Sequence, residues 1–118
     1  MNAIVAERGD VMVRKRRLGF GASGRADRVV VVQPACLNAV LPTTVVVPLE
    51  VGRSSYGVQS RDVPVSAAEA GADRAHIAIV TLVSSASLDR LEPGAVGRLS
   101  AFTLAKIDRV LRIVLGLA

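Results

Sequence analysis

A run of positive side chains near the start of the chain is the first feature with a clear chemical use. Arg14-Lys15-Arg16-Arg17 places four cations in succession, and Arg25 follows in the same stretch. Residues 1–28 hold seven basic and three acidic side chains, whereas the rest of the chain is nearly balanced. Such a cluster binds phosphate groups without distinguishing bases. Nucleic acid is therefore one interpretation, and a solvated basic loop that aids solubility is the other.

The geometry of an extended segment limits how this cluster can be used. Strand alternation would send Arg14 and Arg16 to one face and Lys15 and Arg17 to the other, so only part of the cluster can face one groove. Aromatic residues make up 3% of the chain, and there is no tryptophan. A nucleic-acid site would therefore depend on charge more than on base stacking.

Histidine and cysteine, the other residue types with strong chemistry, occur once each. His76 is the only imidazole that could act as a general base. Cys36 is the only thiol, and a lone cysteine is usually a small buried side chain. No group of His, Cys and carboxylate residues has the spacing of metal ligands. We therefore expect neither a metal ion nor another cofactor.

The same composition suggests a compartment. A single cysteine rules out an intrachain disulfide, which fits a reducing environment. No segment approaches the roughly 18 uninterrupted apolar residues of a membrane span. Residues 1–10 also lack the basic start and apolar run of a signal peptide. We expect a cytoplasmic protein.

The elements that must position these residues are short strands. A chain of 118 residues, 51% of them hydrophobic, is expected to fold as one domain spanning 1–118. Residues 29–32 form a β-branched run that is typical of a strand buried on both faces, and a short connection makes 44–49 its antiparallel neighbour. A glycine-containing loop is expected at 18–26, and a helical turn near 87–91. Strands are predicted at 11–13, 29–32, 44–49, 61–65, 76–83 and 97–99.

The clearest element is a helix at the end of the sequence. Ser100 is a suitable N-cap and Gly116 a suitable stop. Asp108 and Arg112 lie four residues apart and can pair. An amphipathic helix on several short strands predicts an α+β, mainly β fold, a small antiparallel barrel or curled sheet. Apolar residues recur at helical spacing on one side and basic residues on the other: Leu104, Ile107, Leu111, Val114 and Leu115, against Lys106, Arg109 and Arg112.

Four stretches, in order, then carry a resemblance to a known family. They are "RGDV" from Arg8, "RVVVV" from Arg28, "QPACLNAVLPTTVVVPL" around Asn38, and "GRLSAFTLAKIDRVLRIVLGL" from Gly97. In sequence and spacing they are similar to the MazF/PemK family of ribonuclease toxins from type II toxin–antitoxin systems. The resemblance covers nearly the whole chain.

This resemblance implies a fold, an activity and partners. The expected fold is an SH3-like antiparallel β-barrel with a C-terminal helix. The expected activity is metal-independent cleavage of single-stranded RNA by attack of the 2′-hydroxyl, on messenger RNA or on transfer or ribosomal RNA. The expected partners are a cognate antitoxin and a second copy of the chain. The C-terminal helix has a wide apolar surface, because Val110 and Ile113 lie on either side of its main row of apolar residues. This width also favours the homodimer.

The resemblance implies candidate catalytic residues as well. In the family, an arginine that starts the second strand supplies charge and proton transfer, and a threonine or serine after "VVPL" completes the pair. Arg28 matches the arginine, but Glu50 occupies the hydroxyl position. One hypothesis is that Glu50 takes the proton while Arg28 stabilises the dianionic transition state. The other is that Glu50 pairs with a nearby arginine and the site is weakened or inactive. Ser54 and Ser55 could supply a hydroxyl if the loop is offset.

RNA contacts follow from the same likeness. The family's RNA-contacting loop corresponds to Arg14, Arg16, Arg17 and Arg25, and Arg53 near Glu50 is a further candidate for phosphate contact. The strand that His76 opens is structural in the family, which argues against a catalytic histidine. Several family residues are replaced, so base preference should differ: Met12 stands for tryptophan, Lys15 for an acidic residue, Val29 for proline, and Thr81-Leu82-Val83-Ser84 for "(E/D)Q(I/V)R".

Three functions remain open at this point. The first is an endoribonuclease toxin, which Arg28 favours. The second is a catalytically weakened relative that acts as a non-enzymatic, antitoxin-binding or RNA-binding dimer, which Glu50 favours. The third is gyrase poisoning, because a sister toxin family shares the fold, although its terminal-helix features have no match in this sequence.

Overall fold

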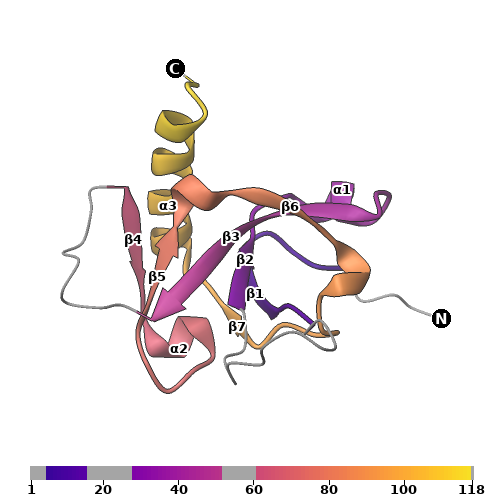
Figure 1. Ribbon diagram of the computed structural model, residues 1–118, viewed down its shortest axis with the longest axis horizontal. Helices are drawn as coiled ribbons and strands as arrows, with labels where there is room; N and C mark the ends of the chain where they lie inside the picture. The colour runs from indigo at the N-terminus through magenta and orange to yellow at the C-terminus, as the bar shows by residue number, and fades with distance from the viewer. Residues whose placement is uncertain (1–4, 16–27, 52–60, 118) are drawn as a thin grey trace.

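The computed structural model describes residues 5–15, 28–51 and 61–117, which form a curled antiparallel sheet with a long helix packed on it (Figure 1). The strands are β1 (Asp10–Val13), β2 (Arg28–Val31), β3 (Thr43–Val51), β4 (Asp62–Val65), β5 (His76–Ile79), β6 (Ser84–Ser87) and β7 (Gly97–Arg98). The helices are α1 (Ala35–Asn38), α2 (Ala67–Ala70) and α3 (Ala101–Val114), with 3₁₀ turns η2 (Val80–Leu82) and η3 (Leu88–Arg90).

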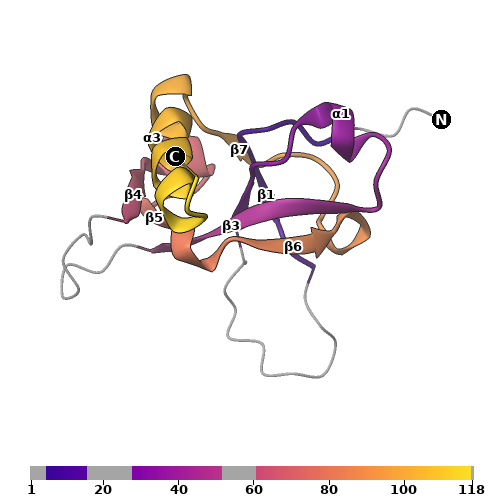
Figure 2. The ribbon, with the colours of Figure 1, turned by 90° about the horizontal axis from the view of Figure 1, so that it is seen from above.

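β3 is the strand around which the sheet curls. The strand order is β4-β5-β3-β2-β1-β7, with β6 also paired to β3, and these pairs are antiparallel. One edge of β3 pairs with β6 and then with β5, while its other edge pairs with β2. Figures 1 and 2 show α1 near the start of β3 and α3 near its end. The predicted curled antiparallel fold with a C-terminal helix is confirmed.

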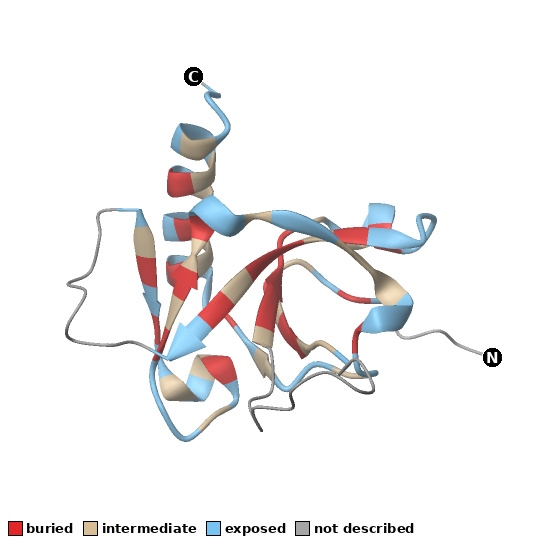
Figure 3. Cartoon of the chain, in the orientation of Figure 1, coloured by how far each residue is buried: buried red, intermediate tan, exposed pale blue. Residues whose placement is uncertain are grey.

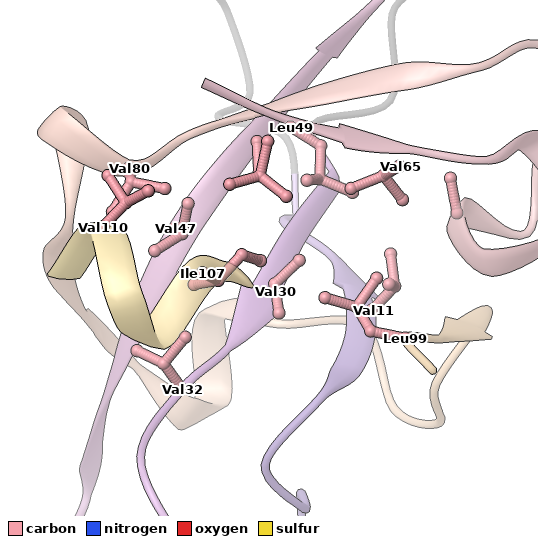
Figure 4. Close-up of a cluster of buried hydrophobic side chains, with 13 residues drawn as sticks. Val11, Val30, Val32, Val47, Leu49, Val65, Val80, Leu99, Ile107 and Val110 are labelled. Atoms are coloured by element: carbon pink, nitrogen blue, oxygen red, sulfur yellow. The ribbon is translucent and has the colours of Figure 1, made fainter. Parts of the chain in front are cut away.

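Two clusters of buried side chains lie on the two faces of the sheet. The first lies between the sheet and α3, where Val30 and Val47 meet Ile107 (Figure 4). The second lies under β6 and η3 and includes Val29 and Val31. Because alternate residues of β2 enter different clusters, the middle and end of this strand are buried on both sides (Figure 3). This explains the uninterrupted valine run.

Helix α3 begins and ends close to the predicted positions. The Ser100 hydroxyl accepts a hydrogen bond from the Thr103 backbone N–H, and Gly116 has a φ of 69° just beyond the last turn. Ile107 is fully buried in the first cluster. In the part of the chain that is described, no helix is long and apolar enough to cross a membrane.

Two details of the helix prediction are wrong. Asp108 forms an ion pair with Arg8, which lies near the other end of the chain, and accepts a hydrogen bond from it. It does not pair with Arg112. Val110 is buried in the first cluster and cannot also form an external contact. Ile113 does remain exposed. The pairing of Arg8 reflects the position of β1 beside the last elements, which helical spacing alone does not reveal.

The predicted strand at 76–83 is too long. β5 ends at Ile79, η2 follows, and β6 is a separate strand that was not predicted. The interruption has a geometric cause, since β5 and β6 pair with successive parts of the same edge of β3. The chain between them must turn a corner, and η2 makes this corner while Val80 enters the first cluster. The short helices α1 and α2 were not predicted either.

Candidate active site

Arg28 lies at the start of β2 and reaches the C-terminal end of α2. Strand alternation gives its side chain the same face as Val30. Its Nε donates to the Ala70 carbonyl oxygen at 3.0 Å, and Nη2 donates to the Gly71 carbonyl oxygen at 3.1 Å. Helix ends leave carbonyls without intrahelical partners, and α2 has no basic residue in its last turn. Arg28 therefore supplies the cation that this helix end lacks.

Helix α2 approaches β7 through two glycines. Gly71 has a φ of 64°, and a Cβ there would lie 1.9 Å from the Val96 carbonyl oxygen. A Cβ on Gly97 would lie 2.2 Å from the Glu69 carbonyl oxygen. Only glycine permits backbones to meet this closely. The two residues therefore determine how near α2 lies to the sheet.

Glu69 joins the start of α2 to the start of α3. With Ser66 it forms a capping box, and its Oε2 accepts a hydrogen bond from the Ser100 backbone N–H at 2.9 Å. Burial raises the pKa of the Glu69 carboxyl. Hydrogen bonds from Ser100, Thr103 and Ser66 outweigh burial and lower the pKa from 4.5 to about 2. The carboxylate therefore stays charged at neutral pH and holds both helix starts together.

Glu50 lies near the end of β3, on the other face of the sheet. Val30 pairs with Val47, so the face of Arg28 is the face of Val47 and Leu49. Glu50 alternates away from this face and is exposed opposite Ile77 of β5. Across the described ranges, no hydrogen bond or ion pair joins Glu50 to Arg28.

The structure therefore places Arg28 and Glu50 at the same end of the sheet without contact between them. β2 begins where β3 ends, because the two strands are antiparallel. Their side chains point to opposite faces in this state. Their role as a reacting pair stays a prediction, and it requires a change in the position of one of the two side chains when RNA binds.

Arg14 and Lys15 are the described part of the basic cluster. Arg14 forms a bridge with Leu91 and is half-buried, and its Nε has no hydrogen-bond partner among the described residues. Lys15 is exposed. The different exposure of these neighbours agrees with strand alternation. The other predicted contacts lie outside the described residues, as do the candidate hydroxyls: Arg16, Arg17, Arg25 and Arg53, with Ser54 and Ser55.

His76 and Cys36 differ in their exposure to solvent. His76 is buried, and its Nδ1 lies 2.8 Å from the Arg74 carbonyl oxygen, so this nitrogen is a donor. This contact supports the structural role expected of the residue. Cys36 is exposed on α1, so the prediction that it is buried is wrong. No three His, Cys, Asp or Glu side chains within the described ranges lie close enough together to hold a metal ion.

Sequence reasoning missed α2, although the signals for it are present. Ser66-Ala67-Ala68-Glu69 has the spacing of a capping box, and Gly71 is a typical helix stop. The helix is only one turn long, so it has no apolar periodicity to attract attention. A search for capping boxes alone would have found the element that contacts Arg28.

Comparison with protein families gives one match that covers most of the chain. The model of the PemK-like, MazF-like toxin of type II toxin–antitoxin systems matches residues 7–115. No curated protein shows a significant sequence match.

Solved structures share the fold at low sequence identity. An endoribonuclease in complex with its cognate antitoxin, from Mycobacterial species, has a TM-score of 0.73 and 21% identity, covering 96% of this chain and 97% of that chain. The MazE-MazF complex (Form-III) from Deinococcus radiodurans gives 0.76 and 18%, covering 98% and 100%. The Mycobacterium tuberculosis toxin MazF-mt6 gives 0.73 and 14%, covering 92% and 98%. At these identities the likeness concerns the fold.

Proposed function

The chain belongs to the PemK-like, MazF-like toxin family of type II toxin–antitoxin systems, and we propose that it is an endoribonuclease that cleaves single-stranded RNA without a metal ion. The observation that carries this proposal is the family match, which spans every described strand and includes Arg28. Structural relatives include an endoribonuclease bound to its cognate antitoxin. We propose the same kind of partner for this chain, together with a homodimer and a cytoplasmic site of action.

The proposed chemistry uses the RNA's own 2′-hydroxyl as nucleophile. Glu50 accepts the hydroxyl proton, the 2′-oxygen attacks phosphorus, and the bond to the 5′-oxygen breaks as that oxygen takes a proton from water. The product is a 2′,3′-cyclic phosphate. Arg28 stabilises the negative charge that develops on the phosphate oxygens. Among the described residues Nη1 of Arg28 has no hydrogen-bond partner, so donors remain for that purpose.

The test is cleavage of a single-stranded RNA in EDTA, with analysis of the product ends. We expect 2′,3′-cyclic phosphates from the wild type and a loss of roughly 10²–10³ in rate for Arg28→Ala. Arg74→Ala, at an exposed position before β5 and away from the outer side of α3, is the control and should cleave normally. Cleavage that requires a metal ion, or that survives Arg28→Ala undiminished, would reject the proposed mechanism.

A second candidate is a non-enzymatic family member that binds RNA or an antitoxin. Two observations favour it. Glu50 replaces a hydroxyl and has no contact with Arg28 in the described part of the chain, and the Arg28 side chain is already bonded to α2. In this case purified wild-type protein shows no cleavage above the buffer blank, while it still forms a complex with RNA or with an acidic antitoxin peptide.

A further inference from the structure

The guanidinium of Arg28 is held by one of its two edges. Nε and Nη2 form the side edge, and this edge donates to the Ala70 and Gly71 carbonyl oxygens at 3.0 and 3.1 Å. The Nε contact is partly buried, whereas the Nη2 contact is exposed. The outer edge, formed by Nη1 and the second Nη2 proton, has no hydrogen bond to any described residue.

We infer that the C-terminal end of α2 is a positioning element that aims the outer edge of Arg28 at an RNA phosphate. A guanidinium edge can donate two parallel hydrogen bonds to a phosphate. An unrestrained arginine would have to be immobilised as the phosphate reaches the transition state, and a side chain that is already held avoids this cost. The inference rests on the proposed function, since it takes Arg28 to be the residue that meets the RNA backbone.

The position of α2 is itself constrained from two sides. Toward β7, the missing side chain of Gly71 lets the helix end touch the Val96 carbonyl, and the missing side chain of Gly97 does the same at Glu69. Toward α3, the Glu69 carboxylate accepts the Ser100 backbone N–H. The carbonyls that hold Arg28 therefore cannot shift unless one of these contacts breaks. Gly71, Gly97 and Glu69 are positioning residues in this scheme.

The hydrogen bonds from Arg28 to the Ala70 and Gly71 carbonyl oxygens could also have the opposite effect on cleavage. If the carbonyls of α2 compete with phosphate for Arg28, the contact would hold the side chain away from RNA. Loosening α2 would then raise activity. The location of the contact argues against this, because α2 binds only the side edge, and no described residue binds the outer edge.

The test compares two glycines that share a backbone conformation but not a contact. Gly71 and Gly116 follow helices with φ of 64° and 69°, but a Cβ on Gly116 would meet nothing within 4 Å. Gly71→Ala therefore displaces α2, whereas Gly116→Ala has only the backbone strain. We expect Gly71→Ala to lower kcat on the order of 10²-fold with little change in KM. Gly116→Ala should leave both within about twofold, since its contacts are unaltered.

A second measurement does not depend on cleavage, and its wild-type part does not depend on whether the Gly71 variant folds. In the wild type, the Arg28 Nε–Hε signal in NMR should be separate from those of solvent-exposed arginines and slow to exchange with water. Gly71→Ala should move it toward the exposed group. Two results overturn the inference. One is a wild-type Arg28 Nε–Hε signal that coincides with those of solvent-exposed arginines, and the other is a rise in kcat for Gly71→Ala. If the wild type cleaves nothing, the proposed function fails, while this signal still decides whether α2 holds Arg28.

Discussion

At the scale of single residues, Glu50 separates the two candidate functions. Its carboxylate can take a proton, which a threonine in the same place cannot do as readily, but it also repels phosphate. Because Glu50 is exposed and makes no contact with Arg28 in the described part of the chain, substitutions there should change folding stability by no more than about 0.5 kcal/mol. Effects on cleavage can then be assigned to chemistry.

The first prediction concerns Glu50→Gln, which keeps the shape but cannot accept the proton. If Glu50 is the base, this change should lower the cleavage rate by roughly 10²-fold or more. Exposed Glu92→Gln is the control and should have the wild-type rate. A full rate in Glu50→Gln would remove Glu50 from the mechanism.

Glu50→Thr, which restores the family's residue, gives a separate prediction. If Glu50 is the base, Glu50→Thr should lower cleavage less than Glu50→Gln does, because the hydroxyl restores the family's residue and also removes the repulsion of phosphate. If the wild type is inactive, cleavage that appears only in Glu50→Thr identifies a relic of the family's site. Both variants are measured on the same RNA, with melting temperatures to confirm that they are folded.

At the scale of elements, the third prediction uses the pH dependence of Glu69. Its folded pKa of about 2 lies below the ordinary 4.5. The stabilisation is therefore present above about 4.5 and is lost as pH falls through 4.5 toward 2. The difference in unfolding free energy between wild type and Glu69→Gln should shrink over that window. Glu92→Gln, at an exposed position, should leave the pH profile unchanged, and the same profile for both variants would exclude the capping role.

The described strands and the last helix were largely predictable because each carries a local pattern. The valines of β2, the stretch from Thr44 in β3 and the Ser100 cap of α3 all have such signals. The end of β5 was not predictable, since it depends on β6 pairing with the same strand. Helix α2 is only one turn long, so its sequence has no apolar periodicity from which a helix could be predicted.

The candidate site was harder to predict than the fold. Residue types and the family resemblance select Arg28 and Glu50, but the register of β2 against β3 decides which face each one occupies. That register comes from tertiary packing. The contact of Arg28 with α2 joins residues 42 and 43 positions apart, which no local pattern reports. The sequence therefore predicts which residues form the candidate site, but not the faces on which they lie or the contacts that they make.

At the scale of the whole molecule, exposed apolar side chains bear on the proposed dimer. On α3, Phe102 and Ile113 are 71% and 69% exposed, while Val40 after α1 is 74% exposed. Large exposed side chains of this kind are typical of association surfaces when they group together. With Val110 inside the core, the outer side of α3 is what remains for the predicted contact.

The fourth prediction is a dimer that depends on α3. Light scattering at micromolar concentration should give about twice 12.3 kDa for the wild type and a single 12.3 kDa chain for Ile113→Glu. Val40→Glu, at an equally exposed site, is the matched control and should remain dimeric. A monomeric wild type would reject the homodimer. Dissociation in Val40→Glu alone would place the interface at α1.

The fifth prediction concerns the basic cluster and salt. If Arg16 and Arg17 hold RNA by charge, replacing both with Ala should weaken binding and reduce the slope of log affinity against log salt by about 0.7 for each of the two that contacts a phosphate. Base preference should hardly change, because phosphate contacts carry no sequence information. The measurement uses a 2′-deoxy analogue that cannot be cleaved by internal attack. An unchanged slope would assign the cluster to solubility.

The first strand, β1, lies beside the last strand, β7, and this arrangement has a consequence for biosynthesis. β1 pairs with β7, and Arg8 is bonded to Asp108, 100 residues later in the chain. Contacts between distant residues form only after the intervening loop has closed. A ribosome must therefore synthesise the chain through Arg98 before β1 can gain β7 as its neighbour. Until residues 97–108 have left the ribosome, β1 lacks β7 and Arg8 lacks Asp108, so a toxin built this way cannot complete its fold, or act, before that point.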